Sequence, residues 1–165
     1  MATTYEPIAT STLGSAAASI TFSSIPATYT DLRVVLVCTA TTNAYPKFRL
    51  NGDTGSNYSS TNVLGTGAAT NSQYEQNDDG IRINGNSPVT TNPSLNTVDL
   101  FSYAGSTYKT TLNVASNDKN GSGVTVSTVG LWRNTAAITS ITLYDLTSLN
   151  FASGTTATLY GIKNA

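Results

Sequence analysis

Residues 123–143, GVTVSTVGLWRNTAAITSITL, decide the fold of this chain. In the first half the apolar positions change parity between Val126 and Val129, and such a shift predicts a β-bulge at residues 127–128. In the second half apolar and polar residues alternate over 140–143, as in a half-buried strand. The segment therefore predicts a β-hairpin in an antiparallel sheet.

The composition of the whole chain also favours β-structure. Only 10% of the 165 residues are charged, against about 25% in an ordinary soluble domain. Ser, Thr and Asn together supply well over a third of the chain. Thr favours strands and Ser, Asn and Gly favour turns, whereas most strong helix formers are scarce. The chain is long enough for one domain with one core, without disulfides or a metal.

Charge and residue usage argue against several classes of function. Eight basic and nine acidic residues give a net charge of -1, so no basic surface is expected to bind nucleic acid. The chain has no His and a single Cys, Cys38, which argues against a thiolate metal site and a His-based catalytic centre. Because Cys38 lies in an apolar run, we interpret it as a core residue. No cofactor is predicted.

Targeting signals are also lacking in the sequence. The first ten residues, MATTYEPIAT, contain neither a basic n-region nor an apolar h-region, so no secretion signal is predicted. No apolar run approaches the length of a membrane span. We therefore expect a protein made in a cytoplasm, with no membrane partner.

Alternating patterns elsewhere predict about nine to eleven strands. Residues 32–39, LRVVLVCT, form the most apolar run and predict a central strand buried on both faces. Residues 109–115 alternate and predict a long hairpin with the strand that begins at Val124. Residues 157–162 predict a last strand near the C-terminus.

Two turn signals stand out between these strands. Residues 51–55, NGDTG, predict a hairpin or bulged loop because Asn and Gly tolerate positive φ. Residues 78–80, DDG, lie between alternating segments and predict a type I′ hairpin. Residues 85–94 contain two prolines and predict a loop.

Many short strands without any helical period predict an all-β, two-sheet antiparallel β-sandwich. Within that class a jelly roll is our first choice, since eight or more strands in two Greek keys fit the count. We expect a single domain over residues 1–165. Residues 1–18 are expected to form an N-terminal arm or an edge strand, because Pro7 cannot donate to a central ladder.

The carboxylates are the candidate catalytic or metal-binding groups of this sequence. Asp78 and Asp79 are adjacent on a predicted turn, where side chains point apart into water. The segment around Asp53 resembles a calcium loop loosely but offers one carboxylate where such loops have several. Asp99 and Asp145 lie near apolar strands, where an ion pair or an edge position explains them better than a glycosidase pair. The sequence therefore predicts no enzyme, no metal and no catalytic residues.

Aromatic and basic residues leave more alternatives open. Trp132 and the nine Tyr could stack on sugar rings, but a core position is favoured for Trp132. Arg133 could contact a neighbouring subunit, whereas the other arginines flank strands with no partner visible in the sequence: Arg33, Arg49 and Arg82. Exposed strand edges rich in Thr could also bind by β-augmentation.

Five segments together resemble a family of small structural proteins of tailed bacteriophages, especially cyanophages. They are YEPIATSTL (5–13), SITFSSIPATYTDLRVVL (19–36), FRLNGDTGSNYS (48–59), VGLWRNTAAITSITL (129–143) and TLYGIKNA (158–165). Leu50 stands where the family often has an aromatic residue, and residues 64–95 carry none of its phrases.

The resemblance implies a virion protein with a jelly-roll-like sandwich that forms a homo-oligomer, a trimer. It further implies capsid decoration: a cement protein on the outer surface of the head that binds the major capsid protein and stabilises joints between capsomers. A receptor-binding or carbohydrate-binding module of the tail or a fibre is the alternative, because the family includes both kinds of protein. The chain shows no coiled-coil or collagen-like repeat, which favours the cement.

Overall fold

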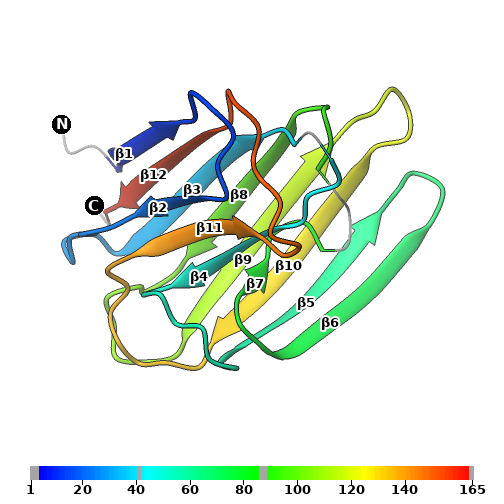
Figure 1. The fold of residues 1–165 in the computed structure, drawn as a ribbon. Coiled ribbons are helices and arrows are strands. Elements are labelled where there is room, and N and C mark those ends of the chain that lie inside the picture. The colour runs from blue at the N-terminus through cyan, green and yellow to red at the C-terminus, as the bar shows by residue number, and fades with distance from the viewer. Residues whose placement is uncertain (1–3, 41, 86–88, 164–165) are drawn as a thin grey trace.

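The computed structural model describes residues 4–40, 42–85 and 89–163. Within these ranges the chain contains no helix and forms twelve strands (Figure 1). The strands are β1 (Tyr5–Thr12), β2 (Ser19–Phe22), β3 (Asp31–Cys38), β4 (Pro46–Leu50), β5 (Tyr58–Gly65), β6 (Thr70–Asp78), β7 (Ile81–Arg82), β8 (Ser94–Leu100), β9 (Lys109–Asn117), β10 (Val124–Trp132), β11 (Ile141–Asp145) and β12 (Thr156–Ile162).

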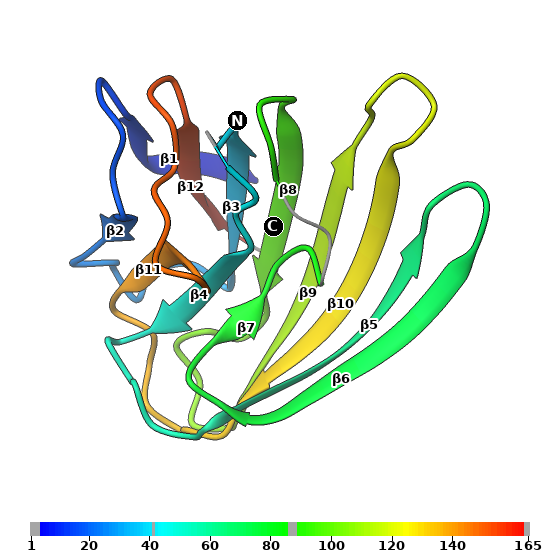
Figure 2. The ribbon, with the colours of Figure 1, turned by 45° about the vertical axis from the view of Figure 1, so that its right-hand side comes forward.

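The strands form two antiparallel sheets packed face to face. The large sheet has eight strands in the order β1-β12-β3-β8-β9-β10-β5-β6, and the small sheet has four in the order β2-β11-β4-β7. The small sheet lies over one part of the large sheet, and the hairpin ends of β9–β10 and β5–β6 reach beyond it (Figures 1 and 2). The prediction of an all-β antiparallel sandwich is confirmed.

The strand order also identifies the topology as a jelly roll. When the β5–β6 and β9–β10 hairpins are set aside, eight strands remain in two sheets of four. These eight pair first with last: β1 with β12, β2 with β11, β3 with β8 and β4 with β7. That nested pairing is the jelly-roll arrangement. The two extra hairpins both extend the large sheet beyond β8.

One hydrophobic core fills the space between the sheets. Its largest side chain is Trp132, which is fully buried and stacks on Tyr58 with ring centroids 6.2 Å apart. The predicted core position of Trp132 is confirmed. Buried Phe, Leu and Ile side chains from both sheets surround this pair, as alternation on the inner face of each strand requires.

The predicted hairpin over residues 123–143 is wrong. Its two halves form strands, but β10 pairs with β9 and β5 in the large sheet, whereas β11 pairs with β2 and β4 in the small sheet. Alternation separates the two faces of a strand and says nothing about which strand it pairs with. The connection between them carries the chain across the core.

The predicted β-bulge at residues 127–128 is also wrong. The register of β10 against β9 runs without interruption from Val124 to Trp132. Val126 and Trp132 point into the core, and Val129 points outward. The change of parity therefore marks apolar side chains on both faces of one regular strand.

Both predicted turns connect different sheets instead of closing hairpins. Asn51 and Gly52 do adopt positive φ, of 53° and 66°, but the turn links β4 in the small sheet to β5 in the large one. Residues 78–80 link β6 in the large sheet to β7 in the small one, and the positive φ falls on Asn77. The residue types of both segments correctly predicted that the chain turns there. Which strands pair on either side of a turn depends on other strands, far away in the sequence.

Other strand predictions are largely confirmed. The β9–β10 hairpin and the last strand, β12, form as expected. Strand β3 lies inside the large sheet between β12 and β8, but only one of its faces is buried, because Val37 on the other face is 43% exposed.

The N-terminal part of the described chain forms an edge strand. Within the predicted arm or edge strand, β1 pairs with β12 along the edge of the large sheet; residues 1–3 lie outside the described residues. Residues 86–88 of the predicted 85–94 loop lie outside them too.

Cys38 is buried in the core, as predicted. Burial raises the pKa of its thiol to about 12, although a hydrogen bond from Asn96 acts in the opposite direction. Because the thiolate is the reactive form, we expect native protein at pH 8 to react with a disulfide reagent more than about a thousandfold more slowly than unfolded protein. Thiol titration with and without urea measures this, and rapid reaction of the native chain would contradict it.

Candidate interaction surface

The outer face of the large sheet carries an unexpected number of apolar side chains. Seven of them are between 42% and 71% exposed, on six adjacent strands: Val37, Val63, Tyr74, Leu95, Leu112, Val114 and Val129. We call these seven residues the outer-face patch.

The members of the patch lie close together in the sheet register, two pairs of them directly opposite each other and the others separated by single Ser or Thr residues. Val129 on β10 lies directly opposite Leu112 on β9. On its other side Val129 faces Thr61 of β5, which in turn faces Tyr74 of β6. Directly opposed side chains lie about 5 Å apart, so this row crosses four strands without a gap.

Charge is sparse across this face. The outward positions of β9, β10, β5 and β6, strands that the structure describes in full, carry no Asp, Glu, Lys or Arg. At the β3–β8 side Arg33 and Asp99 point outward but bind each other through two hydrogen bonds. This pair is the predicted ion pair of Asp99, and it gives Arg33 its partner.

Polar side chains occupy the inner face of the same strands. Asn62, Thr128 and Asn113 are opposite one another on β5, β10 and β9, and all three are buried. Asn113 donates a hydrogen bond to the Arg82 carbonyl. Compared with an ordinary half-buried sheet, the polar pattern is inverted at this row: three polar residues face inward, and the neighbouring Leu112 and Val129 face outward.

The buried Thr128 hydroxyl yields a stability prediction. Its Oγ1 has no hydrogen-bond partner among the described residues. Replacing Thr128 by the isosteric valine removes an unpaired buried polar group, so we expect unfolding free energy to rise by about 1 kcal/mol. Urea denaturation measures the change, with Thr125→Val on the exposed face as a matched control expected within about 0.5 kcal/mol of wild type. A clear loss in Thr128→Val would contradict the prediction.

A shallow groove crosses the outer face near β6. Its volume is about 360 Å³, and its side chains combine apolar Val129 and Leu131 with Tyr74 and polar residues such as Gln76. The Tyr74 side chain is 71% exposed. Aromatic and apolar walls with a few polar groups are typical of small-ligand sites.

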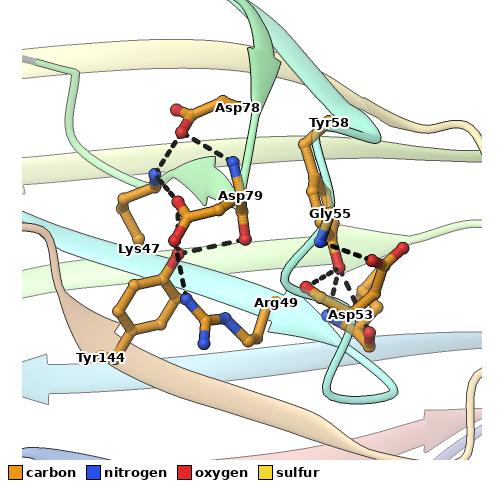
Figure 3. Close-up of polar contacts among 9 residues, drawn as sticks. Lys47, Arg49, Asp53, Gly55, Tyr58, Asp78, Asp79 and Tyr144 are labelled. Atoms are coloured by element: carbon orange, nitrogen blue, oxygen red, sulfur yellow. Dashed lines mark hydrogen bonds and ion pairs between the residues drawn. The ribbon is translucent and has the colours of Figure 1, made fainter.

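The outer face of the small sheet is different, because it carries a group of charged residues. Figure 3 shows Lys47 of β4 between two carboxylates: its Nζ lies 2.8 Å from Asp78 Oδ1 and 2.6 Å from Asp79 Oδ1. Arg49 Nη2 lies 2.8 Å from Asp79 Oδ2, and its guanidinium stacks 4.1 Å from the centre of the Tyr144 ring. We call these five residues the ion cluster.

The ammonium group of Lys47, at the centre of the ion cluster, is fully buried. Burial alone would lower the pKa of Lys47, but the hydrogen bonds that its ammonium group donates to both carboxylates raise it above its usual value. For the Asp79 carboxyl group the directions are opposite. Burial alone would raise its pKa, but the hydrogen bond from Lys47 lowers the pKa below its ordinary range. Asp78 and Asp79 therefore act together on one cation, whereas the sequence predicted that they point apart into water.

Gly80 lets the 78–80 connection lie close to the small sheet. A Cβ atom on it would be 2.8 Å from the Phe48 carbonyl oxygen, closer than real Cβ atoms approach. The connection thus brings both carboxylates onto Lys47.

Asp53, weighed above as part of a calcium loop, instead binds the protein itself. Its carboxylate accepts hydrogen bonds from Trp132 Nε1 at 2.7 Å, from the Gly55 amide at 2.8 Å and from Asn57 Nδ2 at 3.0 Å. Burial would raise its pKa, but these donors, Trp132 foremost, lower it. The loop is anchored to the Trp132 indole.

The remaining residues weighed from the sequence also have partners within the chain. For Asp145 the expectation is wrong, because it forms no ion pair among the described residues and β11 lies inside the small sheet. It accepts hydrogen bonds from the amides of Thr147 and Leu149 and so closes the turn after β11. Arg133 donates to Asn77 Oδ1 at 2.9 Å, and Arg82 pairs with Glu75 at 3.0 Å. The structure brings Asp78 and Asp79 together and places Asp53, Asp99 and Asp145 in separate contacts.

Sequence reasoning missed the outer-face patch, although its signal was present. In β9 the apolar residues Leu112 and Val114 share one parity and Thr111 and Asn113 the other. That pattern alone would turn Leu112 inward, and only the pairing of β9 with β8 and β10 shows that it faces outward.

Comparisons with known proteins concern the fold only. No protein-family model matches the sequence, and no curated protein matches it at a significant level. Among solved structures, the galectin LEC-6 of Caenorhabditis elegans is similar with 10% sequence identity and a TM-score of 0.35, over 91% of this chain and 94% of that one. Within the described ranges, no helix is long and apolar enough to cross a membrane.

Proposed function

We propose that this chain is a virion structural protein that binds the outer surface of a bacteriophage head through the outer-face patch. In this role it is a cement: it contacts the major capsid protein across joints between capsomers. The sequence resemblance supports the class of protein. The inverted pattern, in which the row Asn62, Thr128 and Asn113 is buried while Leu112 and Val129 face outward, supports the surface.

The inverted pattern is the observation that carries the proposal. In an isolated domain, the register of a half-buried sheet is set so that apolar side chains face the core. Here Leu112 and Val129 face outward while Asn113 and Thr128 are buried. Such an arrangement is favourable when the outer face is itself covered, so a partner surface is the simplest physical explanation.

The size of the face fits this role. Six strands about 4.8 Å apart, each with about seven residues rising about 3.3 Å, give a face on the order of 600 Å². A standard protein interface uses about 800 Å² of each partner. With few charges to desolvate, most of this face can become buried against the capsid at little electrostatic cost.

The proposal is tested by binding to capsids. Purified protein is mixed with expanded capsids that lack it, and the bound fraction is measured by co-sedimentation. We expect wild-type protein to bind and Val129→Lys to lose at least about tenfold in affinity, because a lysine at the centre of the patch would have to be desolvated.

Thr21→Lys is the matched control, since Thr21 is exposed on the outer face of the small sheet. It is expected to bind as wild type does. Absence of binding by the wild-type protein, or equal binding by Val129→Lys, would contradict the proposal. Immunogold labelling of virions adds an independent measurement: label over the head is expected, and label confined to the tail would contradict it.

The groove beside Tyr74 favours a second function, a carbohydrate-binding module. An exposed tyrosine ring next to Gln76 and Ser59 offers a stacking surface with hydrogen-bonding groups at its margin. A glycan array and NMR titration test it, with Tyr74→Ala expected to abolish any binding found. An array without a hit would reject this alternative.

A further inference from the structure

The edge strands of the two sheets differ in how well they are protected from pairing with a strand of another chain. In the described part of the chain, the small sheet ends in β2, with four residues, and β7, with two. At one edge of the large sheet β1 contains Pro7, and its register shifts between Pro7 and Ala9. Short strands, prolines and bulges are the usual means of preventing edge-to-edge pairing.

Strand β6, at the other edge of the large sheet, has none of these protections over most of its length. From Thr70 to Gln76 its register against β5 is regular, and the shift comes only after that, at Asn77, which has a φ of 54°. These seven residues, TNSQYEQ, include no proline, no lysine and one charged residue, Glu75. The edge thus presents a regular row of backbone donors and acceptors.

We propose that β6 pairs antiparallel with β6 of a second copy of this chain, so that two large sheets join into one sheet of sixteen strands. This dimer takes the place of the trimer that the sequence resemblance implies. A two-fold axis at Gln73 uses all seven regular residues. Every second residue pair in an antiparallel ladder exchanges two hydrogen bonds, so this pairing gives about six backbone hydrogen bonds.

The side chains of β6 complement themselves in this register. Glu75 lies opposite Asn71, and Tyr74 lies opposite Ser72, so the one charged residue of the edge never faces its own copy. Glu75 also remains paired with Arg82 of its own chain. Like charges directly opposite each other destabilise a sheet, and this pairing places none together.

The dimer extends the surface described above. Tyr74 belongs to the outer-face patch and lies on the edge strand. Pairing two β6 strands therefore joins two patches into one continuous face of about twice the area. The inference goes beyond the proposed function, because the edge uses backbone groups and requires no capsid.

The experiment measures the mass of the purified chain in solution by analytical ultracentrifugation over a range of concentrations. We expect a species of twice 17.2 kDa. Gln73→Lys places two positive charges opposite each other at the axis, and Gln73→Glu places two negative charges there. Each variant alone is expected to be monomeric, and an equimolar mixture of the two is expected to restore the dimer.

Ser127→Lys is the control, because it adds a lysine to the same sheet at an exposed position of β10, which lies inside the sheet and away from the β6 edge. It should leave the dimer intact. The inference would be overturned if the wild-type protein were a monomer or a trimer. It would also be overturned if Ser127→Lys lost the dimer while Gln73→Lys kept it. Capsid binding by Val129→Lys is a separate measurement, so failure of one proposal is distinguishable from failure of the other.

Amide hydrogen exchange on the wild-type chain keeps the test independent of whether the variants fold. Amides of residues 70–76 that point away from β5 should exchange more slowly at high than at low protein concentration. Equal exchange at both concentrations, with the dimer populated only at the higher one, would overturn the inference.

Discussion

The double substitution of Asp78 and Asp79 by asparagine is expected to destabilise the fold by about 3–5 kcal/mol. Both carboxylates bind Lys47, whose side chain is 0% exposed. Without them a buried ammonium group has no anionic partner, which is far more costly than the loss of a surface ion pair. Thermal and urea denaturation measure the loss, with Tm expected to fall by roughly 10 °C.

A third substitution separates charge from packing. Adding Lys47→Met to the double variant removes the buried charge and keeps the length of the side chain, so most of the stability should return. Asp118→Asn, at an exposed loop position, is the control and should change little. If the triple variant were no more stable than the double variant, the ammonium would not be the cause of the loss.

Acid should weaken the same cluster. The pKa of Asp79 is lowered in the folded protein, so its contribution to stability is fully present above its unfolded value of about 4 and disappears as pH falls through the folded value. Between pH 5 and pH 2 the unfolding free energy of wild type is therefore expected to fall more steeply than that of Asp79→Asn.

Replacing Trp132 by alanine is expected to cost about 3–5 kcal/mol, as for other fully buried large aromatic residues. The indole stacks on Tyr58 and donates a hydrogen bond to Asp53, so the substitution removes core volume and releases the loop that Asp53 organises. Urea denaturation followed by circular dichroism measures the loss.

Trp132→Phe separates the free energy contributed by core packing from that contributed by the hydrogen bond to Asp53. It keeps an aromatic ring in the core but loses the charge-assisted hydrogen bond, worth about 1.5–3 kcal/mol. Tyr74→Ala, which removes an exposed ring, is the control and should have a small effect. Equal losses in Trp132→Ala and Tyr74→Ala would contradict the role of Trp132 in the core.

The sequence determined the class of fold through local chemistry. Scarce helix formers and short alternating segments predicted an all-β sandwich, and β3, β9, β10 and β12 lie where their patterns predicted strands. Those signals depend on the alternation of side chains along one strand and on the backbone preferences of Thr, Asn and Gly, which act within a few residues. The burial of Cys38 followed from its apolar run, whereas a core position for Trp132 was favoured because most aromatic residues of strands pack in the core.

The tertiary structure alone decided which strands pair and which face is outside. Residues 78–80 and 123–143 were predicted as hairpins, yet each connects two sheets, because pairing depends on strands far away in the chain. Leu112 and Val129 face outward for the same reason: two-residue periodicity separates the faces of a strand without identifying the core side. The outer-face patch and the Lys47 ion cluster are both assembled by long-range pairing, which local sequence patterns do not encode.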